Sequence, residues 1–217
     1  MKLLLKKELF LAASPLTYIF LVASFMTMLP GYPILVGAFF ICFGIFHSFQ
    51  ATRETNDTLY TVLLPVKKAD IVGAKYAFTC LIQMIGFAVC SALTFVRMTR
   101  LCDSEPYVKN AMMNATPIYL AFVLLIFAAF NILFVGGFFK TGYKIGIPYL
   151  KFGIAVLILV AAGEALHHIP GLEYLNVPSG EGLPLQFAAL CAAALIYAAA
   201  TALACSTAKR RFERIDL

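Results

Sequence analysis

Residues 51–70 read ATRETNDTLYTVLLPVKKAD, and they form the one long polar interruption in the first half of an otherwise apolar chain. Because they lie between two apolar runs of membrane length, they mark a point where the chain leaves the bilayer and returns to it. Thr55, Asn56 and Asp57 are residue types that cap a helix N-terminus, and Pro65 stops a helix from continuing. The pattern therefore predicts a short helix outside the membrane.

This short helix carries apolar side chains that a solvated loop does not need. Leu59, Val62 and Leu63 recur at helical spacing, so the helix offers a small apolar face to something outside the bilayer. Charged residues flank the face on both sides: Arg53, Glu54, Lys67 and Lys68. We expect a docking element for a soluble partner. The alternative is an ordinary polar loop whose leucines rest on the membrane surface.

The composition of the chain indicates an all-α integral membrane protein. Of 217 residues, 62% are hydrophobic and 13% are charged, whereas a soluble domain carries roughly 25% charged residues. Six apolar runs consume most of the length and leave no segment large enough for a soluble core, so we treat residues 1–217 as one transmembrane domain. The expected spans are residues 15–29, 34–50, 71–96, 117–139, 147–166 and 184–206.

Proline positions support these limits, because a proline inside a helix removes a backbone hydrogen bond that lipid cannot replace. All ten prolines avoid the span centres. Ser14–Pro15 and Thr116–Pro117 each pair a hydroxyl N-cap with a proline at the first helical position. The fifth and sixth spans also have a proline in their first turn.

Lysine and arginine predict the orientation, since they gather on the cytoplasmic side of membrane proteins. With the N-terminus inside, the outer side keeps only Arg97, Arg100 and Lys109. The other fourteen are cytoplasmic: Lys2, Lys6, Lys7, Arg53, Lys67, Lys68, Lys75, Lys140, Lys144, Lys151, Lys209, Arg210, Arg211 and Arg214. We therefore expect both termini in the cytoplasm, an interfacial helix over residues 1–14 and an extracellular loop over residues 167–183.

Charge and cysteine usage exclude several function classes. The net charge of +6 comes from cations at the ends of apolar runs, which does not indicate a nucleic-acid partner. The six cysteines show no metal-ligand spacing, and five of them lie in apolar runs. The chain has no G-x-x-x-x-G-K-[ST] motif, so we expect no ATP site and no cofactor of its own.

One cluster at the outer end of the fifth span has metal-binding residue types. Glu164 lies one helical turn before His167 and His168, and carboxylates and imidazoles are zinc ligands. A metal-dependent membrane enzyme is therefore an alternative; the plainer interpretation is a snorkelling acid followed by two loop histidines. We expect no bound metal and no catalytic activity, and we name the three residues as candidates for an outer gate.

Few polar side chains lie inside the expected spans. His47, Gln83 and Asn131 are candidates for a translocation path, because intramembrane polar groups often line one. The alternative is that they hydrogen-bond between helices. No ladder of acidic residues suggests a proton relay, so the energy for transport is expected to come from elsewhere.

The last span carries a ribbon of small residues. Its members recur every four residues: Ala194, Ala198, Ala202 and Ser206. Helices in lipid associate by close packing at such residues, so the ribbon predicts a helix contact. We favour a contact within the chain over one between two chains.

Two stretches carry a family likeness. Residues 50–76, QATRETNDTLYTVLLPVKKADIVGAKY, contain an acid, a short helix, a Leu-Pro-Val turn and a Lys-Tyr pair. They resemble the segment between the second and third spans of small bacterial ABC transporter permeases of the type-two exporter class. Residues 139–144, FKTGYK, resemble the second cytoplasmic loop of these permeases. Among them, the chain is most similar to permeases of exporters for phenol-soluble modulins and similar amphipathic peptides.

This resemblance implies a six-helix permease of the bacterial plasma membrane that works as a dimer with two separate ATPase subunits, which bind ATP and Mg²⁺. The second permease is a second copy or a paralogue, and the other partners are membrane lipids and an amphipathic peptide substrate. Residues 51–70 then correspond to the coupling helix in the ATPase cleft. The implied ATPase contacts are Arg53, Glu54, Asp57, Leu59, Tyr60, Leu63, Leu64 and Pro65, with Lys140 and Lys144 in a secondary loop.

Two further expectations accompany this interpretation. We expect the outer loop over residues 167–183 to help cover the exit of the transport path. A toxin-immunity or scaffold protein that binds its toxin without moving it remains an alternative function.

Overall fold

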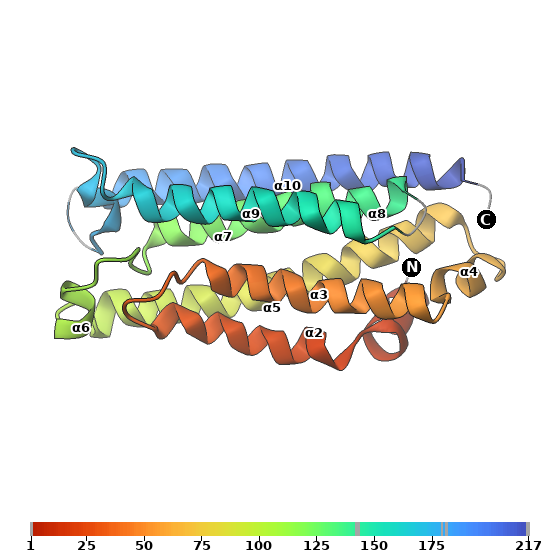
Figure 1. Ribbon diagram of the computed structural model, residues 1–217, viewed down its shortest axis with the longest axis horizontal. Coiled ribbons are helices and arrows are strands. Elements are labelled where there is room, and N and C mark those ends of the chain that lie inside the picture. Colours follow the sequence, from red (N-terminus) through yellow and green to blue (C-terminus); the bar gives the residue numbers. More distant parts are fainter. Residues whose placement is uncertain (1, 142–143, 179, 181, 216–217) are drawn as a thin grey trace.

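The computed structural model describes residues 2–141, 144–178, 180 and 182–215 (Figure 1). These residues form helices and connections, with no strand among them. The N-terminal segment consists of α1 (Lys2–Lys7) and η1 (Glu8–Ala12), and it is bent by 92° against the following α2 (Pro15–Ile19) and η2 (Phe20–Met28). The interfacial location predicted for residues 1–14 stays a prediction.

In chain order the remaining elements are α3 (Val36–Glu54), α4 (Asp57–Val62), α5 (Lys68–Arg100), α6 (Glu105–Val108), α7 (Pro117–Ala129), η3 (Phe130–Val135), α8 (Gly136–Lys140), α9 (Gly146–Leu166), η4 (Glu173–Asn176) and α10 (Leu183–Glu213). The long helices lie side by side along the long axis of the molecule, and the short elements α4, α6 and η4 lie at its ends (Figure 1). Elements α7, η3 and α8 follow one another without a break and form one long helix.

Each of the six expected spans coincides with helical structure, but not every helix meets the requirements for a membrane span. Within the described chain, α5, α7–α8, α9 and α10 are long and apolar enough to cross a membrane, and the bent N-terminal pair raises the number to five if it counts as one span. Helix α3 is not in this set, and its second half contains His47, Gln50 and Arg53. The count of six spans therefore stays a prediction.

The predicted helix starts are largely confirmed. Ser14 is the N-cap of α2, and its hydroxyl accepts a hydrogen bond from the Leu16 N–H at 3.4 Å. Thr116 and Pro117 hold the predicted positions at the start of α7. The Thr116 hydroxyl does not cap that helix, however, because it donates to the Leu175 carbonyl instead, at 3.5 Å. The prolines of α9 and α10 lie in their first turns.

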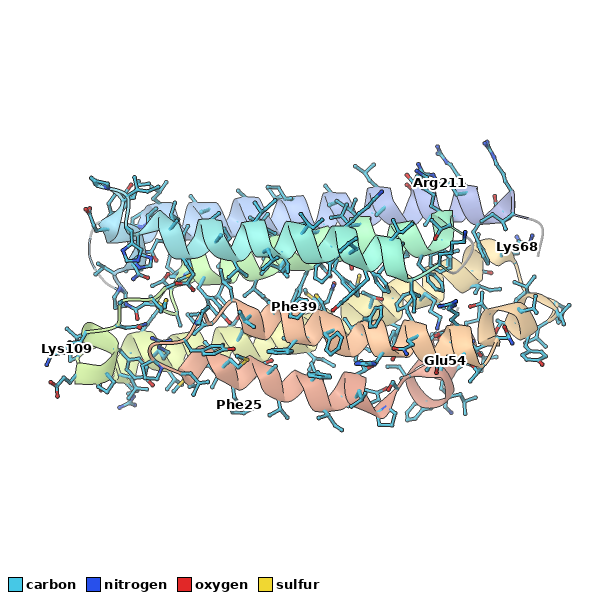
Figure 2. The ribbon with its side chains drawn as sticks, in the orientation of Figure 1. Phe25, Phe39, Glu54, Lys68, Lys109 and Arg211 are labelled. Carbon is cyan, nitrogen blue, oxygen red and sulfur yellow. The ribbon has the colours of Figure 1, made fainter. Side chains whose placement is uncertain are left out.

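The connections separate into two ends of the bundle (Figure 1). The N-terminal segment, α4, the start of α9 and the C-terminal end of α10 share one end, whereas α6 and η4 lie at the other. Figure 2 shows the same division, with Glu54, Lys68 and Arg211 at one end and Lys109 at the opposite end. Which end faces the cytoplasm stays a prediction.

Helix α7 is the most buried of the apolar spans. In its apolar window 72% of the residues are buried, against 6% in α10, so α7 lies inside the bundle and α10 on its outside. Aromatic rings join α3 to the α7–α8 helix: the Phe49 ring meets the Phe134 ring edge-on at 5.2 Å and the Phe138 ring at 5.0 Å. Edge-to-face pairs are favourable beyond the area they bury.

The small-residue ribbon of α10 does not pack within the chain. All four of its members are exposed: Ala194, Ala198, Ala202 and Ser206. The expected contact within the chain is therefore wrong. Helix α10 packs through a neighbouring face, on which Ala193, Ala208 and Phe212 are buried. That face prevails because it also carries polar side chains that hydrogen-bond to α5 and η3.

Helices α2 and α3 approach closely at Gly44. The Thr17 hydroxyl donates to the Gly44 carbonyl at 2.7 Å. A Cβ atom added at Gly44 would lie 2.8 Å from the Phe20 Cβ and 3.2 Å from the Thr17 Cα. Neither of these atoms is the end of a flexible side chain, so a larger residue must push the two helices apart.

We predict that Gly44→Val lowers the free energy of unfolding by about 1–3 kcal/mol, the range for inserting atoms into a packed interior. Gly153→Val is the matched control, because an added Cβ at Gly153 meets nothing within 4 Å. Thermal unfolding in detergent, followed by circular dichroism, measures both. Equal melting temperatures for the two variants contradict the close-packing interpretation.

Candidate functional site

Helix α4 and the residues after it form a short projection at the end of the bundle that holds both termini (Figure 1). The chain reverses at Asn56, whose φ of 52° lies in the left-handed region that asparagine tolerates better than most residues. Asn56 occupies the N-cap position, but no side-chain cap hydrogen bond is formed. The predicted short helix is therefore confirmed, whereas side-chain capping by Thr55, Asn56 or Asp57 is not found.

The outer side of this projection is apolar. Tyr60, Leu63 and Leu64 are 65%, 77% and 54% exposed, and Leu59 is also exposed. We call these four residues the exposed apolar cluster. The sequence predicted Leu59, Val62 and Leu63 on the exposed face. Leu59 and Leu63 are exposed, whereas Val62 is partly buried and packs against the core.

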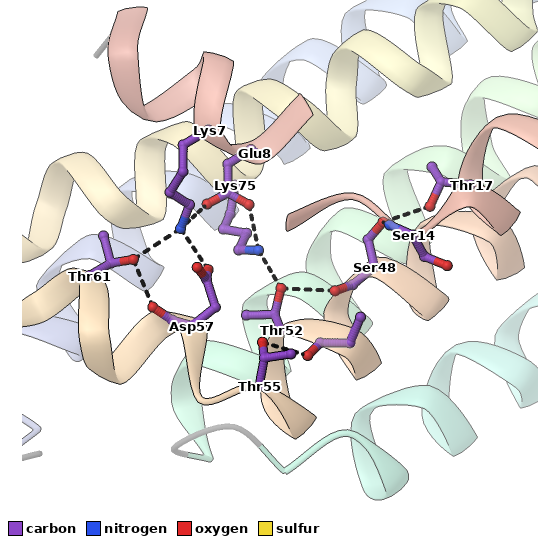
Figure 3. Close-up of polar contacts among 11 residues, drawn as sticks. Lys7, Glu8, Ser14, Thr17, Ser48, Thr52, Thr55, Asp57, Thr61 and Lys75 are labelled. Carbon is purple, nitrogen blue, oxygen red and sulfur yellow. Dashed lines mark hydrogen bonds and ion pairs between the residues drawn. The ribbon is translucent and has the colours of Figure 1, made fainter. Parts of the chain in front are cut away.

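The inner side of α4 is held by the N-terminal segment (Figure 3). The Lys7 ammonium donates to Asp57 Oδ2 at 2.6 Å and to the Thr61 hydroxyl at 2.9 Å. Burial lowers the pKa of Lys7, but the hydrogen bond to Asp57 and the charge of Glu8 raise it by more, so the Lys7 pKa lies above its ordinary value. Asp57, an expected ATPase contact, is thus engaged within the chain.

A buried ion pair lies beside this contact. Glu8 Oε2 is 2.5 Å from the Lys75 ammonium, and each side chain is only 2% exposed. Lys75 also donates to the Thr52 hydroxyl at 2.7 Å (Figure 3). The sequence interpretation counted Lys75 among the fourteen cytoplasmic cations. Lys75 is buried because η1 and α3 cover this turn of α5, and the side of the membrane on which it lies stays a prediction.

The contacts of Lys7, Glu8 and Lys75 therefore join four elements: the N-terminal segment, α3, α4 and α5. Sequence reasoning missed this network. The available signal was the position of Lys75 within an apolar stretch, where a buried ammonium requires a partner of opposite charge. Glu8 is the one acid in a basic N-terminal segment.

The remaining expected ATPase contacts lie at the same end of the bundle. All five are exposed: Arg53, Glu54, Pro65, Lys140 and Lys144. Glu54 also accepts a hydrogen bond from the Gln50 amide at 3.0 Å. Gly142 and Tyr143, which belong to the secondary loop, lie outside the described residues. A role in ATPase binding stays a prediction for the whole set.

Two of the intramembrane polar candidates come together. Gln83 and Asn131 are fully buried and exchange two amide hydrogen bonds of 3.1 Å. Tyr197 donates to Gln83 at 3.0 Å, and Asn131 donates to Thr201 at 2.9 Å, so the network links α5, η3 and α10. In this conformation these side chains serve as interhelical contacts, and a role in a translocation path stays a prediction.

His47 lies apart from that network. Its ring is partly buried among the rings of Phe20, Phe43 and Phe46, and the Phe43 ring is the nearest, at 4.5 Å. The structure therefore gives no continuous line of the three polar candidates.

Glu164 and His167, two residues of the expected outer gate, contact the connection that precedes α7. Glu164 Oε2 accepts from the Met113 N–H at 2.8 Å, and His167 Nε2 lies 3.2 Å from the Ala111 carbonyl oxygen. The His167 and His168 rings are 4.1 Å apart. Among the described residues, no group of three or more His, Cys, Asp or Glu side chains is arranged to hold a metal ion. The metal-enzyme alternative thus lacks a supporting geometry.

A cavity of about 430 Å³ lies at the end of the bundle that holds α6 and η4. Arg97 borders it, donating to the Thr27 carbonyl at 2.6 Å and to Asn114 at 3.0 Å while its guanidinium stacks on the Tyr107 ring. The expected extracellular loop contributes Asn176 and four further residues to the lining. Ser179 and Glu181 of that loop lie outside the described residues, and a covering role for the loop stays a prediction.

The match to a known family covers nearly all of these elements. Residues 3–207 match the family model described as ABC-2 family transporter protein. The chain belongs to the ABC-2 transporter family. It is therefore a multi-pass membrane component of an ABC transporter, a type of permease that generally works with an ABC ATPase and carries out transport rather than catalysis. No curated protein and no solved structure matches this ABC-2 permease significantly.

We predict that Glu8→Gln destabilises the permease by about 3–5 kcal/mol, because it leaves the Lys75 ammonium buried without a counter-charge. Glu105→Gln is the control, since Glu105 pairs with Lys109 on the surface, where an ion pair contributes about 1 kcal/mol or less. Chemical unfolding in detergent measures both. Equal free energies of unfolding for the two variants would contradict the stabilising role of the buried ion pair.

Proposed function

We propose that this permease is the membrane subunit of an ATP-driven exporter and that residues 51–70 couple it to a separate ATPase. The observation that supports this most is the exposed apolar cluster of Leu59, Tyr60, Leu63 and Leu64 on a projecting helix. Apolar side chains gathered at an exposed tip are typical of a protein-interaction site. A partner with an apolar cleft would remove them from water.

The free energies involved favour an apolar contact over a purely ionic one. Shifting a two-state permease from about 1:99 to 99:1 requires roughly 5.5 kcal/mol of differential binding. An exposed ion pair contributes only about 0–1 kcal/mol. Full burial of one large apolar side chain contributes roughly 1.5–3 kcal/mol, so four such side chains suffice where the flanking charges of Arg53 and Glu54 alone do not.

Movement of α4 is proposed to reach the spans through the contacts on its inner side. Asp57 and Thr61 hold α4 to Lys7, and the neighbouring Glu8 is paired with Lys75 of α5. When nucleotide binding closes the ATPases, a pull on α4 therefore tilts α3 and α5 together. In our proposal this tilt opens the transport path outward, past candidate lining residues His47, Gln83 and Asn131.

The proposed assembly follows the resemblance of residues 50–76 to type-two exporter permeases. It has six crossings, including α3, with both termini in the cytoplasm of a bacterial cell. Two ATPase subunits bind ATP and Mg²⁺, and Lys140 and Lys144 provide a secondary contact to them. The permease pairs with a second copy or a paralogue, for which the exposed ribbon of α10 offers a close-packing face. The proposed cargo is an amphipathic peptide, and the Glu164, His167 and His168 region forms its outer gate.

We predict that replacing Leu63 and Leu64 together by serine lowers ATPase co-purification by about tenfold or more, since two large apolar side chains no longer enter the partner. Val108→Ser with Ile169→Ser is the matched control, because these residues are similarly exposed at the opposite end. Co-expression with the ATPase and affinity capture of the permease measure the association.

The same variants are then tested for ATP-dependent peptide transport in sealed inverted vesicles. The Leu63/Leu64 variant is expected to lose transport, and the control variant is expected to keep it. Full association and transport by the Leu63/Leu64 variant contradict the coupling assignment. Toxin binding by the wild-type protein without any ATP-dependent movement would instead identify an immunity or scaffold protein.

A further inference from the structure

A groove of about 700 Å³ lies between the η3–α8 helix, the start of α9 and the C-terminal half of α10. Helices α8 and α9 approach so closely there that a Cβ added at Gly137 would lie 2.8 Å from the Pro148 Cβ. The part of the groove wall farther from the N-terminal segment is apolar. Its main members are Ile132, Leu133, Ile196, Ala199, Leu203 and Ala204.

The other end of this groove is cationic. Lys140 comes from the end of α8, Lys151 from the second turn of α9 and Arg211 from the last turns of α10. No acidic side chain is among the lining residues in the described part of the chain, and Thr141 and Thr207 add two hydroxyl groups. Three elements thus bring positive charge to one end of an apolar channel, and none of the described residues that line it is acidic.

The depth of the groove matches one leaflet of a membrane. Ile196 and Arg211 are fifteen residues apart on α10, which is roughly 22 Å of helix. Half of a bilayer is about 20–22 Å when its headgroup region is included. Arg211 lies at the bundle end that also holds Lys68 (Figure 2). The end of α8 with Lys140 and the start of α9 with Lys151 lie at the same end (Figure 1), where the headgroups of that leaflet would be.

We propose that this groove binds an anionic phospholipid from the adjoining leaflet. Its phosphate lies among Lys140, Lys151 and Arg211, and an acyl chain lies along the apolar wall. Basic pockets between membrane helices are suited to acidic lipid headgroups. A zwitterionic lipid brings its own cation to the same place, so the absence of an acidic lining residue favours the anionic class.

The groove is distinct from the face proposed for a second permease copy. None of the small-residue ribbon members of α10 lines it. One such residue, Ala202, precedes the groove residue Leu203 and therefore lies about 100° around the helix from it. Ala199 borders the ribbon, because it lies three residues before Ala202 and about 60° around the helix from it. A copy packed on the ribbon would leave Leu203 and Arg211 of the groove open to lipid, so this inference does not depend on the cargo.

The test compares lipid retention by the purified full-length permease in native mass spectrometry. The probes are phosphatidylglycerol and phosphatidylcholine with identical acyl chains. We expect stronger retention of phosphatidylglycerol, and we expect the variant K140Q/K151Q/R211Q to bind it about tenfold or more weakly. The control K209Q/R210Q/R214Q also removes three positive charges at this end of the bundle, but from residues that do not line the groove, and its retention should equal that of the wild type.

A second variant tests the apolar wall. Ala199→Trp fills the groove and is expected to lower the retention of phosphatidylglycerol, whereas glycerol phosphate, which has no acyl chain, should not compete at millimolar concentration. Equal retention of the two lipids, equal losses in both charge variants or effective competition by glycerol phosphate would overturn the proposal. A second copy of the chain cross-linked into the groove through Ala200, which faces away from the ribbon, would overturn it as well.

Discussion

The ion pair between Glu8 and Lys75 is the contact on which the arrangement of the terminal end of the bundle depends. Both side chains are removed from water, and separating them would leave a buried charge without compensation. Segment η1 must therefore stay against α5. Lys7 directly precedes Glu8, so the pairing of Glu8 also brings the Lys7 ammonium to Asp57 and Thr61. These contacts hold α4 in place. The buried pair of Glu8 and Lys75 thus determines the position of α4, although its contact with α4 is made only through Lys7.

The outside of the bundle is understandable only with a bilayer around it. Leu157, Leu195 and Leu203 on α9 and α10 are each about 70% exposed within the chain. Such surfaces are a liability in water and are neutral against lipid tails. The long helix formed by α7, η3 and α8 shows the opposite character, since most of its apolar window is buried and Phe134 of η3 meets Phe49 of α3. The polar contacts of the bundle are accordingly found between helices, and the lipid-facing positions are left apolar.

The sequence allowed the helix limits to be predicted because they follow from local rules. Lipid cannot hydrogen-bond to backbone groups that a proline leaves unpaired, so the prolines lie at helix starts, as in Ser14–Pro15 and Thr116–Pro117. The packing partners did not follow from the sequence. Glu8 and Lys75 are far apart in the chain, and no periodicity relates them. The α10 ribbon shows a similar limit, because a spacing of four residues predicts a surface for close packing without naming its partner.

The hydrogen bonds of Gln83 can be compared with the free energy that the proposed transport cycle requires. A tilt of α5 that begins at α4 must either carry η3 and α10 with it or break the hydrogen bonds that join Gln83 of α5 to Asn131 and to Tyr197. Interhelical hydrogen bonds in membranes contribute about 0.6 kcal/mol each, so these three amount to roughly 1.8 kcal/mol. That is less than the roughly 5.5 kcal/mol that a decisive shift between two states demands of the partner. The network therefore holds the resting arrangement of α5, η3 and α10 while remaining weak enough for an ATPase acting through α4 to break it.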